Sequence, residues 1–476
     1  MKKSSQPSFI LSITPIIALL ITLIGIIIAK GADTAQNYSY LILLGAAILS
    51  LTLSVLFYPQ PTKKILEGIK KSASQILPAI PILIFIATVS ATWMLSGVVP
   101  TLIDYGLSFI NPQFFLFIAC IVCSVISVLS GSSWSTIATI GIAFQGIGHV
   151  MGYSDGWVAG AIISGAYFGD KVSPLSDTTV LASSSCKVEL FTHIKYLMLT
   201  SSPAIILALL IYTCVGFFSS TNDVSQSLDV ITALQSSFNI TPLTLIIPAV
   251  TGILIAMRVK TYITLAISSL LGLIGIFAFQ PQIIDMIDYT SSWSDIFIMC
   301  ADILFTETTL STGNELLDSL VSTGGVAGMM PTIYLVLCAM IFGGTLIGTG
   351  MLNAITQTFT YKIISLRQTV SATVGSGLFL NCCTGDQYLS LILGGNLYRN
   401  LYIKNGLEPR LLSRTLEDSI SVTSVLIPWN SCGVTQSTVL GVATLTYLPY
   451  CIFNIASPML SLLFAWFGYK IRILKN

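Results

Sequence analysis

The chain has 476 residues, of which 54% are hydrophobic and only 9% are charged, and its mean hydropathy is +0.87. A soluble domain carries about 25% charged residues, so this composition excludes a soluble enzyme. The near balance of 21 basic and 20 acidic residues argues against nucleic-acid binding. We therefore expect an all-α polytopic membrane protein built from apolar spans of roughly 20 residues each.

Apolar segments recur along the whole chain, and several are too short to cross a bilayer alone. They lie at 10–29, 40–57, 78–99, 113–130, 136–147, 157–168, 196–218, 242–257, 261–280, 331–350, 369–380, 389–398, 419–428 and 439–469. The short segments indicate re-entrant hairpins or broken helices, which occur at membrane depth only where they are buried in protein or line a cavity. The first segment is too long for the apolar region of a signal peptide, so it is predicted to be an uncleaved span.

The basic residues predict which loops face the cytoplasm. Nineteen of the 21 fall at 2–3, 63–71, 187–195, 258–260, 362–367, 399–414 and 470–475. By the positive-inside rule these segments are cytoplasmic, and so are both termini. The segments 31–39, 100–112, 219–240 and 281–325 carry acidic residues and almost no Lys or Arg, so they are predicted to be external.

The two halves of the chain resemble each other at an offset of 254 residues. SGSSWSTIATIG at 130–141 aligns with TGDQYLSLILGG at 384–395, and VSPLSDTTV at 172–180 aligns with LIPWNSCGV at 426–434. The basic loop 63–71 precedes the first copy, whereas acidic residues precede the second, so the copies are predicted to lie in opposite orientations. Inverted-topology repeats are typical of secondary transporters, whose site lies near the midplane where broken helices meet.

This pattern predicts two repeats joined by a linker. The first repeat covers 1–218, with a hairpin near 113–141 and a broken helix near 157–186. An external linker covers 219–241. The second, inverted repeat covers 242–476, with a hairpin near 369–395 and a broken helix near 415–443. It also contains an external insertion at 281–325, which could include an amphipathic helix lying on the membrane.

The candidate binding site lies at the two hairpin tips, 130–136 and 382–388, and at the two breaks, 169–178 and 428–433. Each combines Gly or Pro with oxygen-bearing side chains, and such oxygens suit a small hard cation such as sodium. The candidate ion- or substrate-binding residues are Ser132, Ser133, Ser135, Thr136, Asp170, Ser173, Ser176, Asp177, Thr178, Thr384, Asp386, Asn430 and Ser431. Asp177, Ser176 and Asp386 are the first choice as sodium ligands.

Ionisable residues at bilayer depth usually mark an ion or proton path. The candidate proton path contains Asp177, Asp386, Glu417 and Asp418. Structural alternatives stay open for each acid. Asp177 could cap a half-helix, Asp386 could be a solvated tip residue, and Asp170 could form a neutral pair with its neighbour Lys171. Glu417 and Asp418 could be interfacial caps that pair with Arg410 and Arg414, and the Ser and Thr hydroxyls could bond to backbone carbonyls.

Other conspicuous side chains favour ordinary roles. Trp134 and Trp429 are interpreted as packing residues, and His149 and His193 as surface histidines near the membrane edges, although either histidine could sense pH. The ten cysteines show no paired CxxC spacing with histidines, so neither a metal site, a disulfide framework nor a cofactor is expected. No P-loop or catalytic triad is present, so the chain is not expected to be an enzyme or an ATP-driven pump.

Four sequence blocks resemble the NhaC-type sodium/proton antiporter family of the ion transporter superfamily. They are GSSWSTIATIGIAFQGIG (131–148), GAYFGDKVSPLSDTT (165–179), GDQYLSLILGG (385–395) and SRTLEDS with IPWNSCGV (413–434). The resemblance covers roughly residues 60–470. It implies a bacterial inner-membrane protein that performs sodium/proton antiport or sodium- and proton-coupled exchange of small carboxylates such as malate and lactate, and some relatives move amino acids.

The resemblance also implies functional positions, namely Asp170, Asp177, Asp386, Glu417, Asp418 and Asn430. Two positions depart from the family pattern. Val180 stands where Asn commonly follows DTT, and Ile420 stands where Gly commonly follows EDS. A polar side chain lost beside the first break could alter the ion or the organic substrate.

The leading hypothesis is a secondary active transporter that exchanges sodium and protons by alternating access. The main alternative is a sodium- or proton-coupled exchanger of small carboxylates or amino acids, with Lys171, Arg410 and Arg414 as carboxylate partners. A passive channel or membrane scaffold is a third reading, disfavoured by the inverted repeats. The expected partners are sodium, protons, the lipid bilayer and, in the alternative, an organic anion or amino acid. Whether the chain forms a homodimer stays open.

Overall fold

The computed structural model describes residues 7–219, 224–286, 293–312, 317–318, 321–361, 363 and 365–469. These residues form helices and connecting turns, with one isolated antiparallel bridge between Thr308 and Thr323 and no longer strand pairing among them. The predicted all-α class is confirmed. Lys2 and Lys3 and the basic residues after 469, which were used to orient the termini, lie outside the described residues.

The helices of the first half follow one another with short connections. In chain order they are α1 (Phe9–Lys30), α2 (Ala32–Phe57), α3 (Thr62–Ile76), α4 (Ile80–Leu95), α5 (Val98–Phe109), the 3-10 turn η1 (Pro112–Phe114), α6 (Phe115–Ser130), α7 (Ser133–Thr136), the π-helical turn η2 (Ile137–Gly141), α8 (Ile142–Val150), α9 (Asp155–Val172), α10 (Asp177–Ser185), α11 (Leu190–Phe218) and α12 (Val224–Ser237).

The second half also alternates long helices with short helical segments. Its helices are the 3-10 turn η3 (Pro242–Leu245), α13 (Ile246–Ala256), α14 (Thr261–Phe279), α15 (Pro281–Met286), α16 (Trp293–Phe305), α18 (Gly325–Thr349), α19 (Met351–Thr360), α20 (Leu366–Thr384), α21 (Gln387–Lys404), α22 (Pro409–Leu416), the π-helical turn η4 (Glu417–Ser421), the 3-10 turn η5 (Ser424–Leu426), α23 (Ser431–Leu440), α24 (Thr444–Tyr447), the 3-10 turn η6 (Leu448–Tyr450) and α25 (Ile452–Phe467).

Seven described segments are long and apolar enough to cross a membrane. They are Phe9–Lys30, Tyr38–Phe57, Thr62–Leu95, Pro112–Ser130, Leu190–Phe218, Thr261–Phe279 and Gly325–Thr349. Large apolar side chains remain exposed on them, including Ile28 at 82% and Ile10 at 74%. Water would disfavour such a surface and lipid tolerates it, so the predicted polytopic membrane protein is confirmed.

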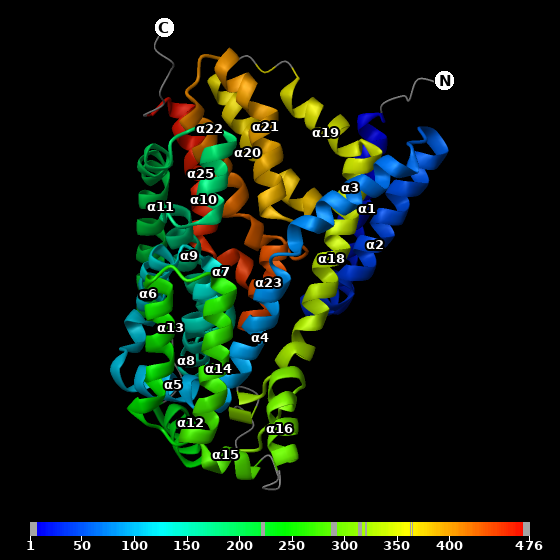
Figure 1. Cartoon of the computed structure of the whole chain (residues 1–476). Coiled ribbons are helices and arrows are strands. Elements are labelled where there is room, and N and C mark those ends of the chain that lie inside the picture. Colours follow the sequence, from blue (N-terminus) through cyan, green and yellow to red (C-terminus); the bar gives the residue numbers. More distant parts are fainter. Residues whose placement is uncertain are drawn as a thin grey trace.

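Two helical hairpins enter the molecule from opposite ends (Figure 1). One consists of α6 and the run α7, η2 and α8, and the other consists of α20 and α21. The second hairpin lies at the end where α1 begins and α25 finishes, whereas the first lies towards the end that carries α12 and α15. The predicted hairpins near 113–141 and 369–395 therefore exist, and their tips meet in the interior.

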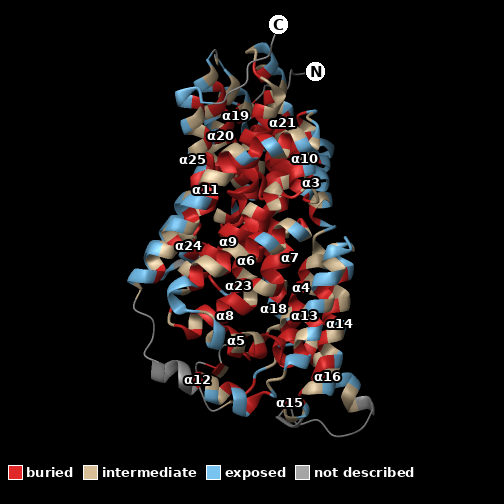
Figure 2. Ribbon diagram, turned by 90° about the vertical axis from the view of Figure 1, so that its left-hand side faces the viewer, coloured by how far each residue is buried: buried red, intermediate tan, exposed pale blue. Residues whose placement is uncertain are grey.

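Both predicted broken helices are also present. α9 and α10 are separated by residues 173–176, and the second break lies at 427–430, between η5 and α23. Buried residues concentrate around these breaks in the middle of the molecule, while exposed residues line its outside (Figure 2). The predicted linker contains α12, and the predicted insertion contains α15 and α16, of which α16 packs against α4 and α18.

Candidate functional site

The first hairpin tip turns at Gly131. α6 ends at Ser130, and Gly131 takes the left-handed conformation with φ of +67°. A Cβ atom at this position would lie 2.7 Å from the carbonyl carbon of Leu175, which belongs to the first break. Glycine is therefore required both for the turn and for the close approach of the tip to the break.

Hydroxyl groups hold the first tip together. The Oγ of Ser132 accepts a hydrogen bond from the backbone N–H of Ser135 at 3.2 Å and so caps α7. The Oγ of Ser130 donates to the carbonyl oxygen of Ser132 at 3.2 Å and lies 3.3 Å from the hydroxyl of Thr136. These bonds satisfy the helix terminus, which leaves its first N–H groups without intrahelical partners.

The second tip repeats this pattern 254 residues later. Gly385 has φ of +66°, and the Oδ1 of Asp386 caps α21 by accepting from the N–H of Leu389 at 2.9 Å. The hydroxyl of Thr384 donates to the carbonyl oxygen of Asp386 at 2.9 Å and lies 2.7 Å from the hydroxyl of Ser390. The two tips are thus equivalent in backbone conformation and in hydrogen bonding.

The two breaks are equivalent in the same register. Ser176 caps α10, with its Oγ 3.4 Å from the N–H of Thr179, and Asn430 caps α23, with its Oδ1 3.1 Å from the N–H of Cys432. Asp177 is the first residue of α10 and Ser431 the first of α23. Each break therefore presents the N-terminus of a half-helix to the interior.

Tip and break are joined by a polar contact in each half. The Oγ of Ser133 and its N–H donate to Oδ2 of Asp170 at 2.7 and 3.2 Å. The counterpart contact runs from the Oγ of Ser424 to Oε1 of Gln387 at 3.3 Å. Neither Ser424 nor Gln387 was selected from the sequence, although the offset of 254 places them opposite Asp170 and Ser133.

The first tip and the first break border a cavity of about 590 Å³. Among the predicted site residues, Ser132, Asp170, Asp177 and Thr178 line it, together with Trp134, Gln387 and Tyr388. Asp177 is exposed and Asp170 partly so. The exposed loop residues Arg258 and Lys260 also line the cavity, which places its mouth beside the α13–α14 connection.

The acid of the second tip is closed off, although Gln387 and Tyr388 beside it line the cavity. Asp386 is 1% exposed and does not line this cavity; its Oδ2 accepts from the Oγ of Ser431 at 3.2 Å. The N–H of Ser431 donates to the carbonyl oxygen of Gly385 at 2.8 Å, so the second break is locked directly onto its tip. Of the three residues chosen first as sodium ligands, Asp177 lines the cavity, whereas Ser176 and Asp386 are buried and do not line it.

Four further predicted residues make bonds within the protein. Ser135 bonds to the Oγ of Ser132 at 3.1 Å, and Thr136 to the carbonyl oxygen of Ser132 at 2.9 Å. Ser173 donates to the carbonyl oxygen of Val128 at 2.8 Å, and the hydroxyl of Thr178 lies 2.9 Å from that of Ser176. Ser173 thereby ties the first break to α6.

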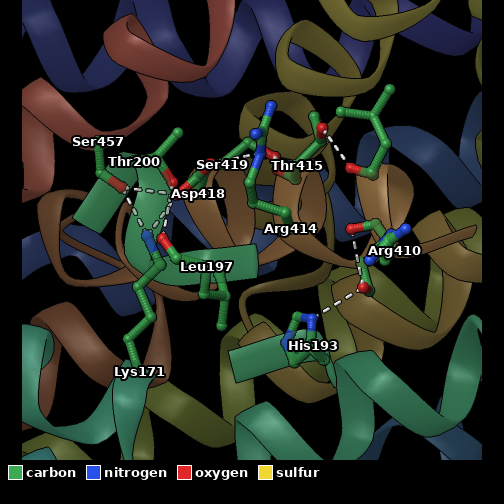
Figure 3. A network of polar contacts seen from close by, with 12 residues as sticks. Lys171, His193, Leu197, Thr200, Arg410, Arg414, Thr415, Asp418, Ser419 and Ser457 are labelled. Atoms are coloured by element: carbon green, nitrogen blue, oxygen red, sulfur yellow. Dashed lines mark hydrogen bonds and ion pairs between the residues drawn. The ribbon is translucent and has the colours of Figure 1, made fainter. Parts of the chain in front are cut away.

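Lys171 does not form the expected pair with Asp170. Its Nζ forms an ion pair with Oδ1 of Asp418 and donates to the Oγ of Ser457 at 2.7 Å (Figure 3). The same carboxylate oxygen accepts from Thr200 at 3.1 Å. Asp170 and Lys171 are consecutive on α9, but their side chains contact different partners. Asp170 accepts from Ser133 of the same half, whereas Lys171 pairs with Asp418 of the other half.

Glu417 and Asp418 are not interfacial caps. Both are 0% exposed, as is Arg414, whose Nε lies 3.8 Å from Oδ2 of Asp418 and whose guanidinium carbon lies 4.7 Å from the centre of the Tyr196 ring. Arg410 pairs with Glu408 instead. The interfacial location in this alternative is wrong, because both acids lie on the buried π-helical turn η4, whereas its pairing of Asp418 with Arg414 is present.

The two histidines differ from each other. His193 is 0% exposed, and its Nδ1 is 2.8 Å from the hydroxyl of Ser413, so its interpretation as a surface histidine is wrong. His149, in the last turn of α8, lies 2.8 Å from Oδ1 of Asp155, with more than a third of each side chain exposed. Trp134 and Trp429 are buried, and Trp429 donates to the carbonyl oxygen of Cys382 at 2.8 Å, as packing residues would.

Comparisons with known proteins agree with this geometry. Residues 165–469, which contain both breaks and the second tip, match the model of the Na+/H+ antiporter family. The chain is 35% identical over 387 residues to the Na+/H+ antiporter NhaC of Alkalihalophilus pseudofirmus, covering 81% of each protein.

Two further relatives carry other names. The chain is 34% identical over 419 residues to the malate-2H+/Na+-lactate antiporter of Bacillus subtilis, covering 87% of this chain and 86% of that one. It is 31% identical over 408 residues to the arginine/ornithine antiporter ArcD of Halobacterium salinarum, covering 86% and 82%. With its broken helices, paired tips and this extent of similarity, the chain belongs to the Na+/H+ antiporter family.

Proposed function

We propose that this chain exchanges sodium for protons across a bacterial inner membrane by alternating access. The observation that carries the proposal is the pair of equivalent tips around one cavity, which Asp170 and Asp177 of the first half line while Asp386 of the second half is buried. In alternating access the repeats move around a fixed site near the midplane so that it opens to one side at a time, and a site that opens to a single cavity fits one such state. The family membership supports the choice of ions.

In this proposal sodium binds at the subsite of the first half, which borders the cavity. Asp170 and Asp177 supply carboxylate oxygens there, and Ser132 and Thr178 supply hydroxyl oxygens. Oxygen ligands of this kind suit a hard cation. Ser133 orients the carboxylate of Asp170, so the cation meets a ligand whose position is already fixed.

The basic loop at the cavity mouth gives the proposal an orientation. Arg258 and Lys260 are exposed, and the positive-inside rule assigns such residues to the cytoplasm. This subsite would then face the cytoplasm. The beginning of α1 and the end of α25 lie at one end of the molecule (Figure 1), which supports the assignment of both termini to the cytoplasmic side.

Everted membrane vesicles with a fluorescent pH probe test this function. Respiration acidifies the vesicle interior and quenches the probe, and sodium added outside should restore fluorescence as protons leave. Asp170→Asn and Asp177→Asn should each reduce the response by about tenfold or more, since an interaction with a charged group is worth roughly 1.5–3 kcal/mol. Glu67→Gln is the matched control, because Glu67 is exposed on α3 and does not line the cavity. A wild-type protein with no response to sodium or lithium would refute the proposal.

A second candidate is coupled exchange of a small carboxylate or amino acid. The size of the cavity favours it, because about 590 Å³ lies within the range of pockets that bind small organic molecules and far exceeds the volume of an ion. Arg258 and Lys260 at the mouth would attract an anion. The names of two relatives, which mention malate, lactate, arginine and ornithine, point the same way.

Thermal unfolding of the purified protein separates the two candidates. A ligand that binds only the folded state raises the melting temperature, and the increase grows with the logarithm of the ligand concentration above Kd. Stabilisation by a carboxylate or amino acid in the presence of sodium would support the second candidate. Stabilisation by sodium alone, across a panel of both classes, would contradict it.

A further inference from the structure

A buried charge cluster includes Lys171, the residue that follows the cavity-lining Asp170. It consists of Lys171, Arg414, Glu417 and Asp418, none of which is more than 1% exposed. Two positive and two negative side chains balance in formal charge. Such groups are expensive to bury, so their retention in the interior of a membrane protein points to a functional role.

Asp418 is engaged within this cluster mainly through its Oδ1 atom (Figure 3), whereas its Oδ2 has no hydrogen-bond partner among the described residues. Its Oδ1 accepts from Lys171, from Thr200 and from Ser457, the last at 2.9 Å. Its Oδ2 faces Arg414 at 3.8 Å. Asp418 therefore contacts both cations but offsets only one positive charge, and these contacts give it a structural reason to be charged.

Glu417 has no such reason. Both of its carboxyl oxygens are buried, and neither has a hydrogen-bond partner. Burying an unpaired carboxylate costs several kcal/mol, whereas the neutral acid avoids most of that cost. The helix around it is also irregular, because Glu417–Ser421 form a π-helical turn, a feature that is frequent at functional sites.

The position of Glu417 links the cluster to the cavity. Lys171 follows Asp170, which lines the cavity, and Asp418 follows Glu417, so the Lys171–Asp418 ion pair joins the immediate neighbours of the two acids. The negative charge of Asp170 opposes ionisation of Glu417. A cation bound at Asp170 would cancel that charge, so binding of the cation favours loss of a proton from Glu417.

The other elements packed against η4 do not supply a competing partner. The charged or titratable groups facing Glu417 are Asp170 and Lys171 of α9, Arg414 of α22, Asp418 of η4, Cys186 of α10 and, beyond Cys186, Arg399 of α21. α25 contains no charged residue, and α20 contains only Arg367, which is exposed in its first turn.

We propose that Glu417 carries the exchanged proton, at a site separate from the sodium ligands Asp170 and Asp177. The inference rests on the antiport function proposed above. With no cation at Asp170, Glu417 is the neutral acid. When sodium binds, the O–H bond of Glu417 breaks, the electron pair stays on the carboxylate, and the proton passes to water. Sodium and proton then occupy the protein alternately although they use different residues.

Proton release on sodium binding tests this assignment directly. Purified protein in weakly buffered detergent solution is mixed with sodium chloride and a pH indicator. The wild type and Glu67→Gln should release protons as sodium binds. Glu417→Gln should release at least about tenfold fewer protons per sodium bound, and sodium should still raise its melting temperature. Glu417→Asp, which keeps an acid, should restore part of the release.

Transport in proteoliposomes provides the second readout. Glu417→Gln should retain exchange of labelled for unlabelled sodium, while its sodium/proton antiport is lost. A Glu417→Gln protein that still releases protons on sodium binding would overturn the assignment. Loss of both exchange modes in Glu417→Gln and Glu417→Asp would also overturn it, because it would indicate a structural role. A wild type that does not respond to sodium would instead refute the antiport function.

Discussion

At the scale of single residues, the two halves share backbone geometry, but their acidic residues stand at different positions of the shared pattern. The tip residue that caps a helix is Ser132 in the first half and Asp386 in the second. At the breaks, Asp170 and Asp177 correspond to Ser424 and Ser431. Serine and aspartate cap a helix about equally well, so the backbone tolerates either one. A tip or break position can therefore carry an acid in one half and a serine in the other, and this makes the two subsites chemically distinct.

The His149–Asp155 pair should make stability depend on pH. The hydrogen bond that the His149 ring donates to the Asp155 carboxylate raises the pKa of His149 above its ordinary value of about 6.5. The stability contributed by the charged pair is fully present below that ordinary value, and it is lost as pH rises through the raised pKa of the folded protein. Because the pair is partly exposed, we expect no more than about 0.2–1 kcal/mol. Melting temperatures measured across this range should therefore fall with pH more steeply in the wild type than in His149→Gln.

Asp155→Asn provides the matching test of the partner. It removes the charge while keeping a side chain of similar size, so it should flatten the same part of the pH profile. Profiles of the wild type and of both variants that run parallel would show that this pair does not contribute. Glu67→Gln should leave the wild-type profile unchanged, since Glu67 is exposed and remote from the pair.

Local chemistry was predictable from the sequence where it depends on neighbouring residues. Gly131 and Gly385 with their following Ser132 and Asp386 predicted both tips, because turn and cap are local features. The partner of Lys171 was not predictable, because Asp418 is 247 residues away and only the fold brings them together. Because Asp170 is adjacent to Lys171 in the sequence, the two residues suggested an ion pair. Their side chains point in different directions, so this pair does not form.

At the scale of elements, the hairpin tip and the break behave as one unit. Gly131 contacts the backbone of Leu175, and Ser133 bonds to Asp170. Movement of the first half-helix must therefore move the tip. The sequence predicted each element from its length and composition, whereas the π-helical turns in the hairpin and at Glu417 follow from packing and left no local signal.

Gly131→Ala should uncouple this unit. The substitution forces a left-handed residue to carry a Cβ, which costs roughly 1–2 kcal/mol, and that Cβ would meet backbone atoms of Leu175 at 2.7 Å. Since backbone cannot rotate away as a side chain can, tip and break must separate. We expect a lower melting temperature together with at least a tenfold loss of sodium-dependent proton movement in vesicles.

Gly441→Ala is the matched control for this change. Gly441 has the same φ of +67°, and a Cβ there would meet nothing within 4 Å. It should therefore show the conformational cost without the collision, and transport should stay near the wild-type level. Equal effects of the two substitutions would mean that contact between tip and break is unimportant.

At the scale of the whole molecule, the buried charge cluster joins the two halves. Lys171 comes from α9 in the first half, and Asp418 comes from η4 in the second. Thr200 of α11 and Ser457 of α25 add the two closing helices to the same carboxylate. The inverted relation of the halves stays a prediction, which the opposite entry of the two hairpins supports (Figure 1).

Substitutions in this ion pair should have unequal effects on stability. Asp418→Asn leaves two buried cations, Lys171 and Arg414, without their shared carboxylate, whereas Lys171→Met leaves Asp418 with Arg414 as a partner. Breaking a buried pair by removing one partner costs about 3–5 kcal/mol. We expect both variants to lower the melting temperature, with the larger decrease in Asp418→Asn.

The double variant Lys171→Met/Asp418→Asn tests whether the two residues act as a pair. Removing both partners eliminates one uncompensated charge, so its loss of stability should be smaller than the sum of the two single losses. Recovery should stay incomplete, because Arg414 still loses the buried carboxylate that faces it. Strictly additive losses would show that Lys171 and Asp418 contribute independently. In that case the two halves would be held together by their other contacts, such as the hydrogen bond from the hydroxyl of Tyr212 to the carbonyl oxygen of Tyr450.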